Sequence, residues 1–127
     1  MRRVLVTGAA SGIGAACAAA LGRDGWDVVG VDLEPDGRSD VRRLDVTDEA
    51  GWDALLADIG PLDGLVTSAG IRTRGMIVDT SLDEWERHLR VNVTGTWLAI
   101  RAMLRAIPAG DVSPRAIVTI SSVNATI

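Results

Sequence analysis

The sequence predicts an α/β domain built on a Rossmann-type, doubly wound parallel sheet. Short β-rich runs alternate with helical ones along the chain, and these runs are apolar on both faces, as in strands covered by helices on both sides. Neither an internal repeat nor a linker divides the 127 residues. We therefore expect residues 1–127 to form one domain, which at this length can build a single core.

Three strands are predicted in the first half of the chain, at 2–7, 27–32 and 41–46. A Gly-punctuated turn and an Ala-rich helix over 12–25 connect the first two, and glycines end that helix. The polar loop of 34–40 leads to the third strand. The link from Asp32 to Val41 is shorter than the dozen or more residues of an ordinary parallel crossover, so we expect little or no helix in it.

Two further strands are predicted, at 62–70, where the strand runs into a turn, and at 115–121. Between the third and fourth strands, Thr47 is typical of a helix N-cap. Ser81 and Glu84 match a capping box, which predicts the start of a long helix over 82–107. One face of this helix repeats apolar residues at core spacing, namely Trp85, Leu89, Val93, Trp97, Ile100, Leu104 and Ile107.

Composition and charge exclude several classes of partner. The net charge is −4 and no basic stripe is present, so we expect no nucleic acid partner. No segment reaches the roughly 18 apolar residues of a membrane span, so we expect no membrane partner. Cys17 is expected to be a buried small side chain, and a single cysteine fits a reducing cytoplasm. His88 is expected to be an exposed helix residue, and one histidine cannot build a metal site.

A glycine-rich turn is the strongest functional signal. The stretch "TGAASGIG", Thr7 to Gly14, directly follows the first strand and opens the first helix. Gly8 allows a tight turn, Gly12 lets the backbone approach a pyrophosphate, and Gly14 permits close helix packing. Phosphates would then lie on the positive N-terminus of the helix. A purely structural turn is the alternative, but the strand–turn–helix context favours dinucleotide binding, and the absence of lysine excludes a P-loop.

The spacing T-G-x-x-x-G-x-G resembles the short-chain dehydrogenase/reductase family. Asp32 ends the second strand, where its carboxylate can accept hydrogen bonds from ribose hydroxyls and repel a 2′-phosphate, so NAD is favoured over NADP. A solvated loop acid is the alternative for Asp32. The stretch "LDVTD" is similar to the family's adenine-contacting segment, and "LVTSAG" to its Asn-Asn-Ala-Gly turn, with Thr67 and Ser68 in place of the asparagines. Besides the three glycines, the resemblance implies cofactor contacts at Ser11, Ile13, Asp32, Leu33, Asp45, Val46, Ser68, Ala69 and Gly70.

Two residues match catalytic positions of the family. Asn92, in "RVNVTG", is a poor interior helix residue and is either a structural polar bridge or, as the family implies, the holder of a relay water at a local helix distortion. Ser122, in "TISSV", matches the serine that binds the substrate carbonyl oxygen. Ser121 is expected to serve the backbone turn, and a plain pair of serines after a strand is the alternative.

The family completes its active site with Tyr-x-x-x-Lys, and this sequence contains neither tyrosine nor lysine. The resemblance covers the whole chain but only the family's N-terminal half, so we expect a truncated domain with strand order 3-2-1-4-5 that lacks the later strands. One hypothesis is an NAD(P)-dependent oxidoreductase that transfers hydride between nicotinamide and a small-molecule alcohol or ketone. The other is a catalytically inactive nucleotide-binding module or relic. The resemblance also implies a homo-oligomer formed through the 82–107 helix.

Overall fold

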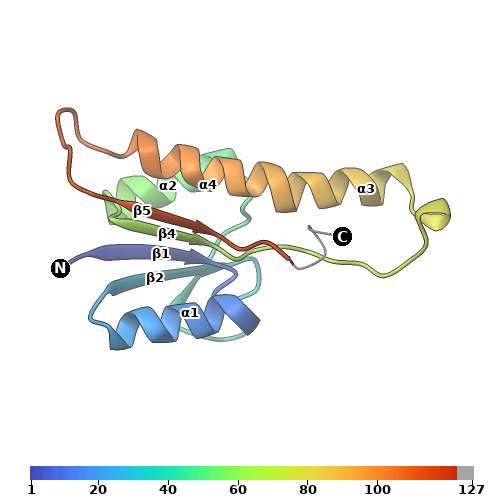
Figure 1. Ribbon diagram of the computed structural model, residues 1–127, viewed down its shortest axis with the longest axis horizontal. Coiled ribbons are helices and arrows are strands. Elements are labelled where there is room, and N and C mark those ends of the chain that lie inside the picture. The colour runs from blue at the N-terminus through green and yellow to red at the C-terminus, as the bar shows by residue number, and fades with distance from the viewer. Residues whose placement is uncertain (123–127) are drawn as a thin grey trace.

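Five parallel strands form one sheet in the computed structural model, which describes residues 1–122 (Figure 1). The strand order is β3-β2-β1-β4-β5, as predicted, and every neighbouring pair is parallel. In chain order the elements are β1 (Arg3–Thr7), α1 (Gly12–Arg23), β2 (Asp27–Asp32), β3 (Val41–Arg43), α2 (Glu49–Ile59), β4 (Gly64–Thr67), the 3₁₀ turn η1 (Ile77–Asp79), α3 (Leu82–Leu89), the π-helical turn η2 (Arg90–Thr94), α4 (Gly95–Arg105) and β5 (Ala116–Thr119).

Helices cover both faces of the sheet, so the central strands are apolar on both sides. Figure 1 shows α1 on one face and α2 with α4 on the other. Within β1, Val4 and Val6 pack in the core under α1, while Leu5 packs in the larger core under α2 and α4. This alternation follows from the two-residue period of a strand. The continuous apolar runs in the sequence are therefore explained by burial on both faces.

The segment between β3 and α2 corrects two expectations. β3 ends at Arg43 rather than residue 46, and α2 has Asp48, not Thr47, at its N-cap position. The hydroxyl of Thr47 instead donates to Asp45 Oδ1 at 2.7 Å, and its N–H donates to the same oxygen at 2.9 Å. The Asp45 carboxylate thus binds both the N–H and the hydroxyl of Thr47 in the turn before the helix, and the helix begins one residue later than predicted.

The helical run after residue 81 is not one regular helix. Ser81 does cap α3 as predicted, because its hydroxyl accepts a hydrogen bond from the N–H of Glu84 at 3.1 Å. The π-helical turn η2 then separates α3 from α4, which ends at Arg105. The distortion that the family resemblance implied at Asn92 is thus present.

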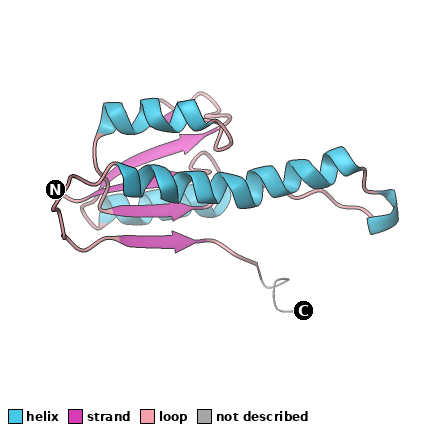
Figure 2. Cartoon of the chain, turned by 90° about the horizontal axis from the view of Figure 1, so that it is seen from above, coloured by secondary structure: helices cyan, strands magenta, loops and turns pink. Residues whose placement is uncertain are grey.

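The core positions predicted on this run are partly wrong. Trp85 and Trp97 are 55% and 54% exposed, and the residues of α4 that enter the core are Leu98, Ala99, Ala102 and Met103. One reason is geometric: α3 extends past the sheet in both views and has no strand to pack against (Figures 1 and 2). The other is that η2 changes the helical phase, so an α-helical spacing counted across it selects the wrong face.

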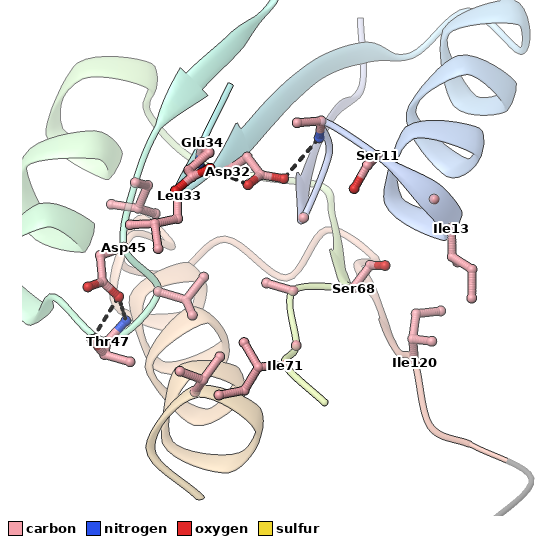
Figure 3. Close-up of a pocket in the computed structure, with 18 of the residues that line it drawn as sticks. Ser11, Ile13, Asp32, Leu33, Glu34, Asp45, Thr47, Ser68, Ile71 and Ile120 are labelled. Carbon is pink, nitrogen blue, oxygen red and sulfur yellow. Dashed lines mark hydrogen bonds between the residues drawn. The ribbon is translucent and has the colours of Figure 1, made fainter. Parts of the chain in front are cut away.

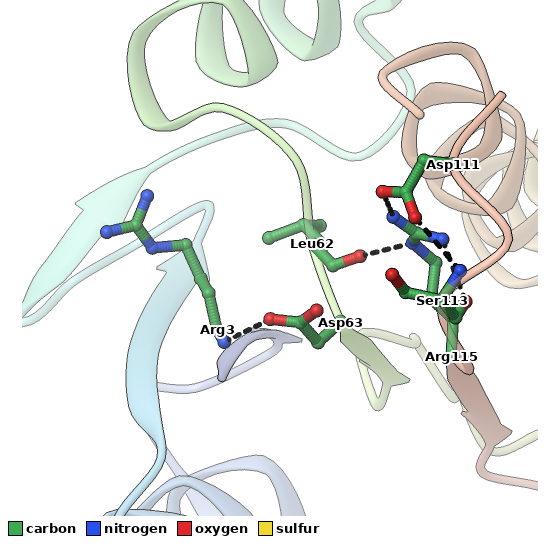
Figure 4. A network of polar contacts seen from close by, with 6 residues as sticks. All are labelled: Arg3, Leu62, Asp63, Asp111, Ser113 and Arg115. Carbon is green, nitrogen blue, oxygen red and sulfur yellow. Dashed lines mark hydrogen bonds and ion pairs between the residues drawn. The ribbon is translucent and has the colours of Figure 1, made fainter. Parts of the chain in front are cut away.

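A polar network joins β5 to β4 at the end of the sheet where these strands begin (Figure 4). Arg115 donates to the carbonyl oxygen of Leu62 at 3.1 Å and pairs with Asp111 at 2.5 Å. Hydrogen bonding by Ser113, assisted by Arg115, holds the pKa of Asp111 well below its ordinary value. The loop that precedes the edge strand is therefore fixed by polar contacts rather than by core packing.

The link between β2 and β3 contains no helix, as its length predicted.

Within residues 1–122, none of the helices combines the length and the apolar character needed to cross a lipid bilayer.

Candidate functional site

A cavity of about 670 Å³ opens where the strands end, and Figure 3 shows its lining. It lies beside the neighbouring strands β1 and β4, where the strand order reverses, and open α/β sheets bind their ligands at such switch points. Its volume falls in the range of about 300–1,000 Å³ that small-molecule sites occupy. The predicted cofactor residues in its lining are Gly8, Ser11, Gly12, Ile13, Asp32, Leu33, Asp45, Val46, Ser68, Ala69 and Gly70.

The three glycines of the turn differ in the space that a Cβ would meet at each of them. Gly8 has φ +66°, and a Cβ there would lie 2.9 Å from the nitrogen of Ala69. Gly12 has φ +56°, and a Cβ there would have no atom within 4 Å. Gly14 lies behind the turn and outside the cavity lining, where a Cβ would be 2.1 Å from the carbonyl oxygen of Gly8. Gly14 therefore sets the packing of α1 on the turn, whereas Gly12 leaves open backbone at the cavity.

Thr7 joins the glycine turn to the turn after β4. Its buried Oγ1 accepts hydrogen bonds from the N–H groups of Ser68 and Ala69, each at 3.0 Å. The turn is thus held by backbone donors rather than by the Ser68 hydroxyl. Only its position directly before Gly8 marks Thr7 in the sequence. The neighbouring Thr67 Oγ1 is the one buried side-chain polar atom without a hydrogen-bond partner among residues 1–122.

Asp32 is half-buried at the cavity wall, and both of its carboxylate oxygens accept backbone hydrogen bonds. Oδ2 accepts from the N–H of Ala10 at 3.0 Å, and Oδ1 accepts from the N–H of Glu34 at 3.1 Å (Figure 3). These bonds fix the carboxylate between the glycine turn and the end of β2. Because a carboxylate has about four acceptor positions, two remain for a ligand.

Two arginines that were not singled out from the sequence brace the loop after β2. Arg43 donates to the carbonyl oxygen of Leu33 at 2.7 Å. Arg38 donates to the carbonyl oxygen of Ala9 at 3.3 Å and pairs with Asp40 at 2.6 Å. The hydrogen bond from Arg38 holds the pKa of Asp40 below its ordinary value. The contacts of these arginines are long-range or loop-internal, so no local sequence pattern indicates them.

The side chains of Asn92 and His88 hold the segment 71–73, which follows the turn after β4. The Asn92 side chain donates to the carbonyl oxygen of Ile71 at 2.9 Å and accepts from the N–H of Ile71 at 2.7 Å. His88 Nε2 accepts from the N–H of Thr73 at 3.2 Å, while Nδ1 lies 2.7 Å from the carbonyl oxygen of Glu84. A carbonyl only accepts, so the proton of this contact is on Nδ1. His88 is therefore half-buried and engaged, not the exposed residue that was expected.

The two predicted catalytic residues lie outside the cavity lining. Asn92 contacts Ile71, which does line the cavity. Ser122 is exposed and follows β5, two residues after Ile120, which also lines the cavity. Among residues 1–122, no group of three or more His, Cys, Asp or Glu side chains is arranged to hold a metal ion.

The sequence and the fold of this chain match known proteins. A family model described as short chain dehydrogenase matches residues 2–127. The chain belongs to the short-chain dehydrogenase/reductase family. Trans-4-hydroxycyclohexanecarboxylate dehydrogenase of Sinomonas cyclohexanicum is 36% identical over 94% of this chain and 54% of the relative. The 3-alpha-(or 20-beta)-hydroxysteroid dehydrogenase of Mycobacterium bovis is 38% identical over 94% of this chain and 50% of the relative.

Solved structures of the family have the same fold. A short chain dehydrogenase from Mycobacterium smegmatis superposes with a TM-score of 0.83 at 34% identity, covering 96% of this chain and 57% of that protein. Ligand-free aldohexose dehydrogenase of Thermoplasma acidophilum superposes with a TM-score of 0.81 at 34% identity, covering 98% of this chain and 50% of that protein. The chain therefore spans about half the length of the relatives that it matches.

Proposed function

We propose that this chain binds NAD in the cavity and forms the cofactor-binding part of an oxidoreductase that acts on a small-molecule alcohol or ketone. The observation that carries the proposal is the position of Asp32, whose carboxylate is fixed at the cavity wall by Ala10 and Glu34. Membership of a dehydrogenase family and relatives named for hydroxylated ring compounds support the substrate class.

The residues present fit a dinucleotide. The open space at Gly12 lets a phosphate approach the backbone, and the N-terminus of α1 presents N–H groups without partners inside the helix. The free acceptor positions of Asp32 suit the adenosine ribose hydroxyls, and its charge opposes a 2′-phosphate. When bound, the nicotinamide supplies the hydride chemistry. We assign Ser122 to binding of the substrate oxygen. We assign Asn92 to holding either the backbone of Ile71 or a relay water.

The 127 residues contain no tyrosine and no lysine, so the family's general acid/base is not among them. Loss of a positioned acid/base typically lowers a rate by about 10²–10⁴-fold. This composition favours the second candidate, a nucleotide-binding module without turnover, for the polypeptide on its own. We expect the purified 127-residue chain to bind NAD and to show no measurable alcohol or ketone turnover. Sustained NADH production with a panel of secondary alcohols, with contamination excluded, would reject that expectation.

The Asp32→Asn variant tests the cofactor assignment. It keeps the shape of the side chain and removes its negative charge. Because an amide nitrogen only donates, the variant also leaves the N–H of Ala10 or of Glu34 without its acceptor. Hydrogen bonds to charged groups contribute about 1.5–3 kcal/mol, so the affinity for NAD should fall roughly 10-fold to 100-fold. The affinity for NADP should fall less or rise, because the repulsion is removed. Calorimetric titration with both nucleotides measures the ratio.

Asp53→Asn is the matched control, because Asp53 is an exposed carboxylate on α2 outside the cavity lining. It should leave both affinities unchanged. An NAD-to-NADP preference that is the same in Asp32→Asn and Asp53→Asn would contradict the ribose assignment.

We also propose that α3 and α4 mediate self-association in the cytoplasm. Large apolar side chains exposed along this run are Leu82, Trp85, Leu89, Val93, Trp97 and Leu104. Burial of such side chains against a second copy would be favourable. Sedimentation velocity should show an oligomer that Trp85→Arg dissociates. A monomer at all concentrations would refute the proposal.

A further inference from the structure

Val46 lines the cavity and is held from behind by the core. The indole Nε1 of Trp52 donates a hydrogen bond of 2.9 Å to the carbonyl oxygen of Val46. Trp52 belongs to α2 and is only 1% exposed, so its N–H has no access to solvent. A buried indole N–H needs a partner, and here that partner is a backbone atom of the cavity lining.

Other contacts fix the same segment from different sides. Thr47 is tied to Asp45 Oδ1 through both its N–H and its hydroxyl. The N–H of Asp48 donates to the carbonyl oxygen of Asp45 at 3.0 Å. Gly95, at the start of α4, lies so close that a Cβ there would be 2.7 Å from Val46 Cγ2. Segment 45–47 is therefore held by α2, by α4 and by its own turn.

These contacts use three of the six backbone polar groups of segment 45–47. In the peptide between Val46 and Thr47, the carbonyl oxygen accepts from Trp52 and the N–H donates to Asp45. The Asp45 carbonyl accepts from Asp48. Among the contacts of residues 1–122, the N–H of Val46 has no protein acceptor. The N–H of Asp45 likewise has no protein acceptor among these contacts. The Val46 N–H lies next in the chain to the carboxylate of Asp45, and both residues line the cavity.

We propose that Trp52 is a positioning residue for the adenine end of the cofactor site. Its indole N–H holds the Val46 carbonyl toward the core and thereby presents the Val46 N–H and the Asp45 carboxylate as an adjacent donor and acceptor. An aminopurine edge offers the complementary ring-nitrogen acceptor and amino donor, whereas a 6-oxopurine does not. The ligand identity rests on the proposed function, and the role of Trp52 rests on the contacts of segment 45–47.

The Trp52→Phe variant tests the proposal, because it keeps an aromatic core residue and removes only the N–H donor. In the ligand-free chain we expect faster amide hydrogen exchange at Thr47, measured by NMR. In titrations with AMP and IMP, the unsubstituted chain should prefer AMP. Loss of one neutral hydrogen bond should reduce AMP affinity about threefold to tenfold, with IMP affinity nearly unchanged.

Trp97→Phe is the control, because Trp97 is exposed on α4 and lies outside the cavity lining. It should change neither the exchange at Thr47 nor the AMP-to-IMP ratio. A purely structural role of Trp52 would lower stability without changing that ratio, so an unchanged ratio in a folded Trp52→Phe protein that still binds NAD overturns this inference alone. Absence of NAD and AMP binding by the unsubstituted chain would overturn the proposed function and this inference with it.

Discussion

Replacement of Gly14 by alanine is the sharpest test of how the glycine turn is built. The added Cβ would lie 2.1 Å from the carbonyl oxygen of Gly8 and 2.6 Å from its carbonyl carbon, whereas ordinary contacts begin near 3.4 Å. Both atoms belong to the backbone and cannot rotate away. The helix α1 or the turn must therefore move by about 1 Å, and overpacking of this kind typically costs about 1–3 kcal/mol.

Gly22→Ala provides the reference, because Gly22 lies in the same helix and a Cβ there would meet no atom within 4 Å. Alanine is favoured over glycine in a helix interior by about 1 kcal/mol, and because both glycines lie in a terminal turn of α1, a similar part of this gain applies to both variants. It cancels when the two are compared. We therefore expect the free energy of unfolding of Gly14→Ala to lie about 1–3 kcal/mol below that of Gly22→Ala.

Urea denaturation followed by circular dichroism measures this difference, and NAD titration reports the position of the turn. Gly22→Ala should be slightly more stable than the unsubstituted chain and should bind NAD equally well. Gly14→Ala should be less stable and should bind NAD more weakly, because Gly8 and Gly12 are displaced together. Equal stability and equal NAD affinity of the two variants would refute the packing argument.

Two further substitutions test other polar contacts. Thr7→Val leaves the N–H groups of Ser68 and Ala69 without their acceptor, which should lower the free energy of unfolding by at least about 1–3 kcal/mol in urea denaturation, whereas Thr119→Val on the exposed edge strand should have little effect. The pKa of Asp111 is depressed in the folded protein, so its carboxylate stabilises the fold above the ordinary value of 3.8 and this contribution disappears as the pH falls below it. Asp111→Asn should therefore be less stable than the unsubstituted chain at neutral pH, and the gap should close in acid; a gap that is constant with pH would contradict this.

The sheet was predictable because its signals are local. Apolar runs with strand period, separated by helices and punctuated by glycine, fix five parallel strands without reference to distant residues. The tight turn at Gly8 and the close packing at Gly14 were predictable for the same reason, since tolerance of positive φ and the absence of a Cβ are properties of glycine itself.

The missed features depend on which of several possible partners the folded chain brings to each polar group. The Thr47 hydroxyl could accept a hydrogen bond from a helix N–H or donate one to the Asp45 carboxylate, and only the structure shows that it donates to Asp45. In the sequence Trp52 is only a core residue and Thr7 only a strand residue. The role of their polar atoms appears only in the fold, where Trp52 contacts Val46 and Thr7 contacts Ser68. The exposure of Trp85 was missed because helical spacing does not reveal where the supporting sheet ends.

The π-helical turn η2 makes the orientation of α3 depend on the number of residues in Arg90–Thr94. In a regular helix each residue advances the rotation by about 100°, so one residue more or fewer in Arg90–Thr94 would rotate α3 about its axis by roughly that angle relative to α4. The core contacts of α4 would stay in place, while Asn92 would turn away from Ile71, and faster amide exchange at Ile71 would report it. The rotation of α3 relative to α4 thus depends on the number of residues in η2. Substitutions are therefore easier to accommodate in η2 than an insertion or a deletion.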